Sequence, residues 1–457
     1  MTATTSRPGP HCRRLLPRAQ IESRWRGPLT LALTLIFTLF LCPELAQAAA
    51  RFSDYATGYR AQLKNSILPY WQDSTLDAER GGFILGDSLT GKTEVKEKQL
   101  VSQARLVWTF AHVHRKGYSD AKRDYLKSAT HGYQFLLSHF QDSTHGGFFW
   151  KTDLSGKTLN SRKILYGEAF VIYAFVEYYR ASGDRDALQQ ALALFRLIQE
   201  KAHDRANGGW FEHFQADWTP ILKEQDGIEV EIPGLKSANA HLHLMEALAE
   251  LVEASHDSEA TRALEECLKI NQKYFYPRDP ARSAFHKTPD WKPVDGPRSA
   301  GLSYGHNVEF AWLMIRAEQV LGRRPSWDHF DAHLDHTLRF GYDHLRGGVY
   351  LKGFENEPAV STDKVWWVQA EMLAAFAEAY KSRSKPRYNQ PLFSLLDFLA
   401  KYQADPKDGI WLDTVTAEGK PKVPSKAHLW KANYHDVRAI VKFIETFEIP
   451  PQQRVRR

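Results

Sequence analysis

Histidines that could exchange protons lie in three short segments of the chain. His306 and Glu309 are three residues apart, so on a helix they share a face and can hydrogen-bond to each other. His243 follows Asn239 by four residues at the start of a second helix, and His435 lies near the C-terminus. An unperturbed imidazole has a pKa of about 6.5, so it can take and return protons at neutral pH. The segments favour acid–base chemistry, although a satisfied core pair or a solvated polar face would explain any one of them alone.

Metal and nucleotide chemistry fit the pattern less well. His241 and His243 are two residues apart, so on a helix they point in different directions and do not converge on one ion. No glycine pattern of a dinucleotide-binding fold is present. We therefore expect neither a metal nor a cofactor.

Other side chains are suited to holding a sugar. Arginine is rarely buried unless it is paired, and its planar fork can grip sugar oxygens. The chain has 13 tryptophans, whose rings can stack on sugars, although a large aromatic core needs the same residues. The candidates, each weak alone, are Arg105, Tyr166, Trp366, Trp367 and Trp430.

A repeat indicates which elements position these residues. An Asp-x-x-x-Gly-Gly motif begins at Asp77, Asp142, Asp204 and Asp343, with a weaker copy at Asp405. Successive copies are about 60 to 65 residues apart, except for one gap of about twice that length. Glycine supplies positive φ and aspartate bonds nearby backbone, so these segments are predicted turns. The long gap indicates a unit without the glycine pair, which makes six units.

Between the turns, apolar residues recur at helical spacing. Leu244, Leu248 and Leu251 form one stripe, and similar stripes cover residues 173–179, 188–198, 310–320 and 368–380. Two helices per unit in six units predict an all-α fold, an (α/α)6 barrel. Polar residues of its inner helices would meet in one cavity at the axis.

The first residues are typical of an export signal. An arginine-rich start precedes an apolar run from Leu29 to Leu41, and Ala46–Ala48 supplies small residues for cleavage. We expect a signal peptide over residues 1–48, a barrel domain over 49–457, and an exported protein, periplasmic or secreted, with no stable membrane insertion after cleavage. An uncleaved anchor is the alternative.

The remaining composition narrows the possible partners. The leader carries about four of the six excess positive charges, so the mature domain is nearly neutral and has no basic stripe for nucleic acid. Only Cys267 remains after cleavage, in a context typical of a buried thiol. The expected partner is a small carbohydrate, and the oligomeric state stays open between monomer and homodimer.

Several motifs in a fixed order carry a family resemblance. They are Ala104-Arg105 before Trp108, Tyr166-Gly167 with Ala169-Phe170, Gly208-Gly209 with Asp217-Trp218, Asn239 to His243, Tyr304-Gly305-His306 with Glu309, Trp366-Trp367 with Gln369-Ala370-Glu371, and Trp430 five residues before His435. From about Tyr55 to Phe447 the chain resembles the N-acylglucosamine 2-epimerase superfamily, and within it the cellobiose 2-epimerases and their mannose-isomerising relatives.

The resemblance implies an (α/α)6 barrel and a role for each matching residue. His306 and His435 correspond to the two catalytic acid–base residues, and His243, with Asn239 nearby, to a third active-site histidine. Glu309 corresponds to the carboxylate that orients the first catalytic histidine. The substrate contacts implied by the family are Arg105, Tyr166, Trp366 or Trp367, and Trp430.

Three differences from the residues usual in the family leave the choice of substrate open, but they do not affect the expected reaction type. Members often carry threonine at Ala240 and glutamine at Glu168, and cellobiose epimerases often read Asp-Ile at Asn307-Val308. All three changes spare the residues that match the catalytic ones.

The implied reaction inverts C2 of a reducing sugar. One histidine removes the C2 proton of the open aldose, Arg105 and His243 stabilise the enediolate, and a second histidine protonates the opposite face. An aldose–ketose isomerase acting on mannose would use the same intermediate, and an N-acylglucosamine 2-epimerase is a further alternative. An inverting glycosidase, which needs two carboxylates across the cavity, and a non-catalytic sugar-binding barrel are the remaining rivals.

Overall fold

The computed structural model describes residues 43–88, 95–383 and 386–448 of the chain. Met1–Ala50 and Arg51–Arg457 form separate compact units. Most of the predicted signal peptide lies outside the described residues, and within the described part no helix is long and apolar enough to cross a membrane. The export signal therefore stays a prediction, and the domain of interest is the second unit.

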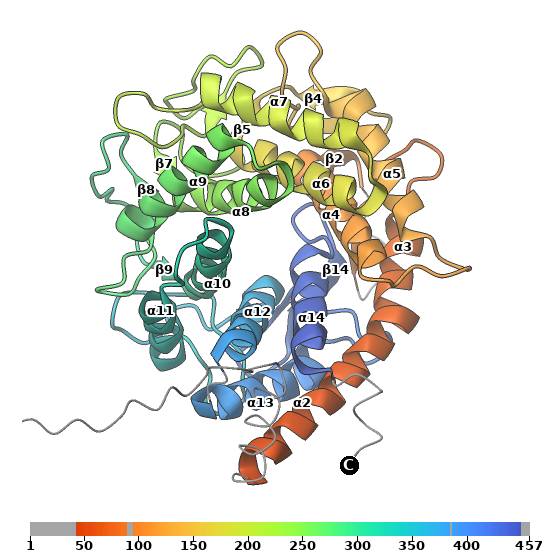
Figure 1. Ribbon diagram of the computed structural model, residues 1–457, viewed down its shortest axis with the longest axis vertical. Helices are drawn as coiled ribbons and strands as arrows, with labels where there is room; N and C mark the ends of the chain where they lie inside the picture. The colour runs from red at the N-terminus through yellow and green to blue at the C-terminus, as the bar shows by residue number, and fades with distance from the viewer. Residues whose placement is uncertain (1–42, 89–94, 384–385, 449–457) are drawn as a thin grey trace, which may run out of the picture. The chain divides into compact units, whose positions relative to one another are not determined.

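Six helices of the described chain form the inner ring of this domain (Figure 1). Each packs against the next, and the last packs against the first, so the ring closes. The inner helices are α4 (Leu100–Arg115), α6 (Leu165–Ser182), α8 (Ala238–Ser255), α10 (Tyr304–Val320), α12 (Trp366–Arg383) and α14 (Tyr434–Phe447).

A second layer of helices covers the ring from outside. Four of the outer segments in the described chain contain a π-helical turn, and in three of them it ends the helix before the following turn. The outer elements are α2 (Pro43–Gln62), η1 (Leu63–Ile67), α3 (Leu68–Thr75), α5 (Tyr125–Phe135), η2 (Leu136–Phe140), α7 (Arg185–Lys201), α9 (Ser258–Ile270), η3 (Asn271–Phe275), α11 (Trp327–Phe340), η4 (Pro386–Tyr388), α13 (Asn389–Phe398) and η5 (Leu399–Gln403). The predicted barrel of helix pairs is confirmed.

Short antiparallel strands link neighbouring units at one end of the ring. The strand before each inner helix pairs with the strand after the next turn, and β14 pairs with β1 to close the ring. The pairs are β2 (Glu97–Gln99) with β3 (Lys151–Asp153), β5 (Lys163–Ile164) with β6 (His213–Phe214), β7 (Lys236–Ser237) with β8 (His286–Lys287), β9 (Leu302–Ser303) with β10 (Lys352–Gly353), β11 (Lys364–Val365) with β12 (Thr414–Val415), and β14 (Ser425–Ala427) with β1 (Asp87–Ser88). Two hairpin strands, β4 (Thr158–Asn160) and β13 (Pro421–Val423), extend these sheets.

A buried lysine joins each of these strands to a turn in five of the units. Lys98 Nζ donates to Asp77 Oδ2 at 2.9 Å, to the carbonyl of Gly81 at 2.5 Å and to that of Leu154 at 2.8 Å. Gly81 and Gly82 have φ of +88° and +63°, which explains the glycine pair. The equivalent ion pairs are Lys163–Asp142, Lys236–Asp204, Lys364–Asp343 and Lys426–Asp405.

The unit without a glycine pair also lacks this lysine–aspartate pair among the described residues. At the position of the turn, Arg278 and Ala281 form an isolated antiparallel β-bridge. Lys236 and Ser237 form strand β7 directly before α8, and the Ser237 hydroxyl caps α8 by accepting from the Ala240 N–H. Cys267 is buried, as expected, and its thiol donates to the carbonyl of His241.

Near the start of most inner helices, a buried side chain accepts a hydrogen bond from the backbone N–H of the residue that follows the glycine pair. Gln103 accepts from the Phe83 N–H at 2.8 Å and donates to the Phe83 carbonyl at 2.9 Å. Glu168 holds the same place in the next unit and accepts from the Phe148 N–H at 2.9 Å, but its Oε2 has no partner among the described residues. Burial raises the pKa of Glu168 to about 8. A protonated Glu168 can act as Gln103 does, which accounts for an acid at this position.

Replacing Glu168 with Gln should make stability less sensitive to pH. The folded-state pKa of Glu168, about 8, lies above its ordinary 4.5, so the folded state holds the proton more tightly and the wild type loses stability as pH rises through this window. We expect the two proteins to match at about pH 4.5, and Glu168→Gln to be more stable by on the order of 2–4 kcal/mol above pH 8, measured by urea unfolding.

The reverse substitution, Gln103→Glu, is the matched control and should introduce the same pH-dependent loss. A difference between Glu168→Gln and the wild type that stays constant across this pH range would contradict a protonated Glu168.

Candidate active site

A cavity of about 230 Å³ lies inside the inner ring. Its lining side chains come from the first two turns of the inner helices and from the segment just before α14. All ten predicted site residues line it together: Arg105, Tyr166, Asn239, His243, His306, Glu309, Trp366, Trp367, Trp430 and His435. The N-terminal ends of helices carry partial positive charge, so this position suits an intermediate that develops negative charge.

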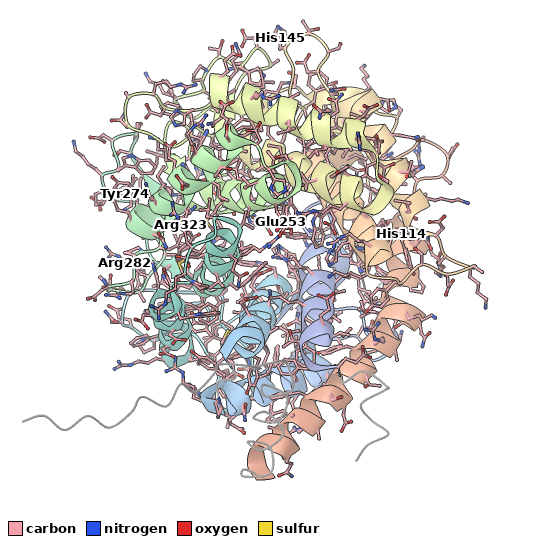
Figure 2. The ribbon with its side chains drawn as sticks, viewed as in Figure 1. His114, His145, Glu253, Tyr274, Arg282 and Arg323 are labelled. Carbon is pink, nitrogen blue, oxygen red and sulfur yellow. The ribbon has the colours of Figure 1, made fainter. Side chains whose placement is uncertain are left out.

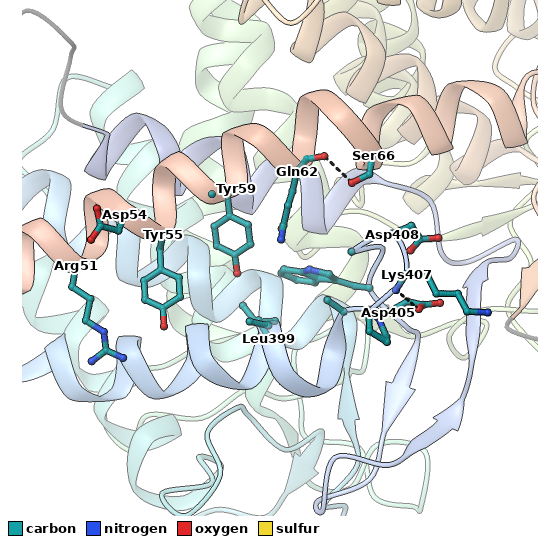
Figure 3. A pocket seen from close by; sticks show the side chains of 16 residues that line it. Arg51, Asp54, Tyr55, Tyr59, Gln62, Ser66, Leu399, Asp405, Lys407 and Asp408 are labelled. Carbon is teal, nitrogen blue, oxygen red and sulfur yellow. Dashed lines mark hydrogen bonds between the residues drawn. The ribbon is translucent and has the colours of Figure 1, made fainter.

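Larger hollows of the described surface do not contain this set. A groove of about 660 Å³ lies between α2 and the turn after η5, where Tyr59 points toward Leu399 (Figure 3). Another, of about 300 Å³, is lined by ion pairs such as Arg316 with Glu250 and Glu253 (Glu253 is labelled in Figure 2). Size therefore does not identify the site, whereas the convergent polar groups do.

His435 is held by a buried carboxylate. Its Nδ1 lies 2.6 Å from Glu371 Oε1, and both side chains are buried. Burial lowers the pKa of His435 to about 3, against the opposing effect of Glu371. Although burial opposes ionisation of Glu371, Arg438 and His435 lower the pKa of Glu371 to about 2. The resting His435 is therefore a neutral imidazole with a fixed ring orientation, as a general base requires.

His243 has a similar arrangement on α8. Its Nδ1 lies 2.9 Å from Glu246 Oε2, and Glu246 Oε1 accepts from the Tyr434 hydroxyl at 2.5 Å. Burial lowers the pKa of His243, while Arg438 and His243 overcome burial and lower the pKa of Glu246 to about 2. Its neighbour His241 points away from the cavity and accepts from the Trp210 N–H, so the two histidines diverge as expected.

His306 differs from the other two histidines. Among the described residues no hydrogen bond joins it to Glu309, so the expected orienting pair is not formed. Its ring packs instead against Trp367, with the centroids 4.9 Å apart, and part of its surface stays open to the cavity. Burial lowers the pKa of His306 to about 4. The carboxyl group of Glu309 lies instead near Arg438, whose Nη2 donates to Glu309 Oε1 at 3.4 Å.

Arg438, on the face of α14 that also carries His435, links the carboxylates beneath the cavity. Its Nη2 donates to Glu371 at 2.7 Å, its Nη1 contacts Glu246, and its guanidinium lies 4.8 Å from the ring centroid of Trp312. Both glutamates bind a cavity histidine, so one guanidinium holds the partners of His243 and His435.

Arg438 was not among the predicted site residues, and neither Glu371 nor Glu246 was predicted to hold a histidine. The available signal was spacing: Arg438 follows His435 by three residues, as Glu246 follows His243. What no spacing could show is that the two pairs, on α8 and α14, meet at one point across the ring.

Arg105 supplies the cation of the cavity wall. Its Nη2 donates to the Tyr166 hydroxyl at 2.8 Å and its Nη1 to the carbonyl of Trp430 at 3.3 Å. Its guanidinium also lies 4.4 Å from the ring centroid of Phe170. The fork is thus fixed before a substrate arrives, which favours stabilisation of a developing oxyanion.

One group in the described chain has the ligand spacing of a metal site. Atoms of Glu309, Glu371 and His435 lie within 4.8 Å of one another. Arg438 already bonds to both of these carboxylates, so a metal ion there would have to displace or face a buried guanidinium. The donor set does not fit a resident metal.

Comparison with known proteins agrees with this geometry. The family described as N-acylglucosamine 2-epimerase (GlcNAc 2-epimerase) matches residues 82–439, and the chain belongs to this family. The cellobiose 2-epimerase of Dictyoglomus turgidum is 28% identical over 84% of this chain and 96% of its own. A solved cellobiose 2-epimerase from Spirochaeta thermophila shares 32% identity with a TM-score of 0.76, covering 89% of this chain and 98% of the other.

The D-mannose isomerase of Thermobifida fusca is also similar, with 29% identity over 65% of this chain and 75% of its own. The family and these relatives confirm the expected fold and make the protein an enzyme of the isomerase class, a carbohydrate epimerase or isomerase.

Removing the charge of Arg438 should change the titration of the cavity histidines. Arg438 contributes to the lowered pKa of both His243 and His435, so Arg438→Met should raise both pKa values, measured by NMR of labelled imidazole rings. It should also destabilise the fold by about 3–5 kcal/mol, because it leaves buried carboxylates without their cation.

Arg438→Lys is the control that keeps the charge and removes the planar fork. It should restore the low histidine pKa values in large part while remaining less stable than the wild type. Unchanged histidine titration in Arg438→Met would show that the guanidinium does not act on these rings.

Proposed function

We propose that this enzyme is a sugar 2-epimerase that interconverts glucose- and mannose-configured reducing sugars, with a cellobiose-type disaccharide as substrate. The carrying observation is that two imidazoles held largely neutral, His306 and His435, line one cavity together with the cation of Arg105. The helices that supply them, α10 and α14, are separated in the ring by α12, and the ring of Trp367 packs against both histidines.

The proposed chemistry follows from these positions. One imidazole removes the proton from C2 of the open-chain aldose, and the electron pair moves into an enediolate. Arg105, already fixed by Tyr166 and Trp430, stabilises the developing oxyanion, and His243 lies in the same wall. The other imidazole, protonated when it acts, returns a proton to the opposite face of C2. The reaction is reversible, so the two histidines exchange roles with direction.

The carboxylates argue against glycoside hydrolysis. An inverting glycosidase needs two carboxyl groups facing each other across the substrate, about 6.5–9.5 Å apart. Of the glutamates around Arg438 only Glu309 lines the cavity, while Glu246 and Glu371 are bonded to histidines and to the guanidinium. The histidines, not the acids, are the groups placed to act on a sugar.

Aldose–ketose isomerisation is the second candidate, and the similarity to a D-mannose isomerase favours it. It would pass through the same enediolate and return the proton to C1 rather than C2. The predicted export signal would bring the enzyme to oligosaccharide fragments outside the cytoplasm, which supports a disaccharide substrate and a periplasmic or secreted location.

Incubation in heavy water distinguishes these reactions. With cellobiose, mannobiose, glucose and mannose as separate substrates, we expect NMR to show an inverted C2 carrying deuterium. A ketose product would show that the enzyme is an aldose–ketose isomerase rather than an epimerase. Cleavage of the disaccharide would contradict both activities.

His306→Ala and His435→Ala should each lower kcat by at least about 100-fold, the lower end of the range for a lost acid–base group. The matched control is His145→Ala, at an exposed histidine of a turn, which should keep wild-type kcat. Full activity in either cavity variant would remove that residue from the mechanism.

A further inference from the structure

Glu309 is the member of the carboxylate cluster with the weakest partner. Arg438 Nη2 lies 3.4 Å from Glu309 Oε1, whereas it lies 2.7 Å from Glu371 Oε1, and Nη1 of the same guanidinium contacts Glu246. Its Oε2 has no hydrogen-bond partner in the described chain, although the side chain is only 1% exposed and lines the cavity. A buried polar atom that has no protein partner, on a side chain that lines a substrate cavity, calls for a partner such as a ligand.

Glu309 shares its nearest cation, Arg438, with two other buried glutamates. Glu246 and Glu371 each bond to Arg438 and to a histidine ring, so both are held as carboxylates. Arg438 is the cation that contacts all three glutamates, and Glu309 lies farther from it than Glu371 does. A third ionised glutamate would add one uncompensated negative charge in a buried site, which proteins avoid by keeping the proton.

We propose that Glu309 is a neutral carboxylic acid whose Oε2 hydroxyl donates a hydrogen bond to a sugar oxygen in the cavity. This role rests on the proposed function and refines it, since it gives the site a second kind of donor beside the cation of Arg105. Burial and the neighbouring charge of Glu371 raise the pKa of Glu309 well above its ordinary value, in the same direction.

A neutral donor has a specific use in this reaction. The bond from a carboxylic acid to an oxygen strengthens as negative charge develops on that oxygen, so it stabilises the enediolate more than the starting sugar. An ionised Glu309 in the same place would repel the enediolate. The geometry therefore assigns Glu309 to the substrate rather than to the orientation of His306.

Gln substitutions at the three glutamates test this assignment. Glu309→Gln keeps a neutral donor of similar shape and should lower kcat/KM by about threefold to tenfold, while Glu309→Leu should lower it by about 100-fold or more. Glu371→Gln and Glu246→Gln replace ionised partners of histidines and should each lower it by about 100-fold or more. A Glu309→Gln enzyme as impaired as Glu371→Gln would overturn the proposal.

Infrared spectroscopy of the full chain tests the proton without an activity assay. At neutral pH the wild type should show the carbonyl band of a protonated carboxylic acid, with a component lost in Glu309→Gln and Glu309→Leu and kept in Glu371→Gln. Absence of that component overturns the proposal even if the sugar assay succeeds. If the wild type epimerises no sugar, the proposed function fails while the spectrum still decides whether Glu309 is neutral.

Discussion

The barrel depends on a buried ion pair repeated around the ring. In five units a lysine from the strand before an inner helix reaches the aspartate of a turn, and in three of these it also bonds to the carbonyl of the first glycine. Each pair fixes the first turn of an inner helix against its neighbour, and the pairing of β14 with β1 closes the ring. The functional side chains stand in or next to those first turns, so this interaction at the periphery sets the geometry of the cavity.

A second set of charges acts at the axis. Arg438 gathers three glutamates, two of which orient His243 and His435, and the third of which faces the cavity. One guanidinium thereby connects α8, α10, α12 and α14 beneath the substrate. Burial lowers the pKa values of the three cavity histidines and so favours their neutral form. Hydrogen bonds to Glu246 and Glu371 fix the ring orientations of His243 and His435, so the site is arranged for proton transfer before a sugar binds.

Periodicity made most of the fold predictable. The aspartate–glycine turns gave the number of units, including the one without glycines, because such turns need positive φ at fixed places. The cavity residues were also predictable, since their motifs resemble those of a known family. The pairing of Glu309 with His306 was predicted wrongly: spacing along α10 permits that bond, but it carries no information about Arg438, which approaches from another helix and donates to the Glu309 carboxyl group. Contacts across the ring depend on closure of the whole barrel, which no local pattern encodes.

The central claim is that two different histidines act on opposite faces of C2. Deuterium content at early conversion in heavy water tests it most directly. If one histidine keeps the abstracted proton while the other, which carries a deuteron from solvent, protonates the opposite face, the first epimer formed carries deuterium at C2 while the recovered substrate carries none. Epimer that retains the original hydrogen, or deuterium appearing equally in substrate and product from the start, would indicate a single shared base and contradict the assignment of His306 and His435.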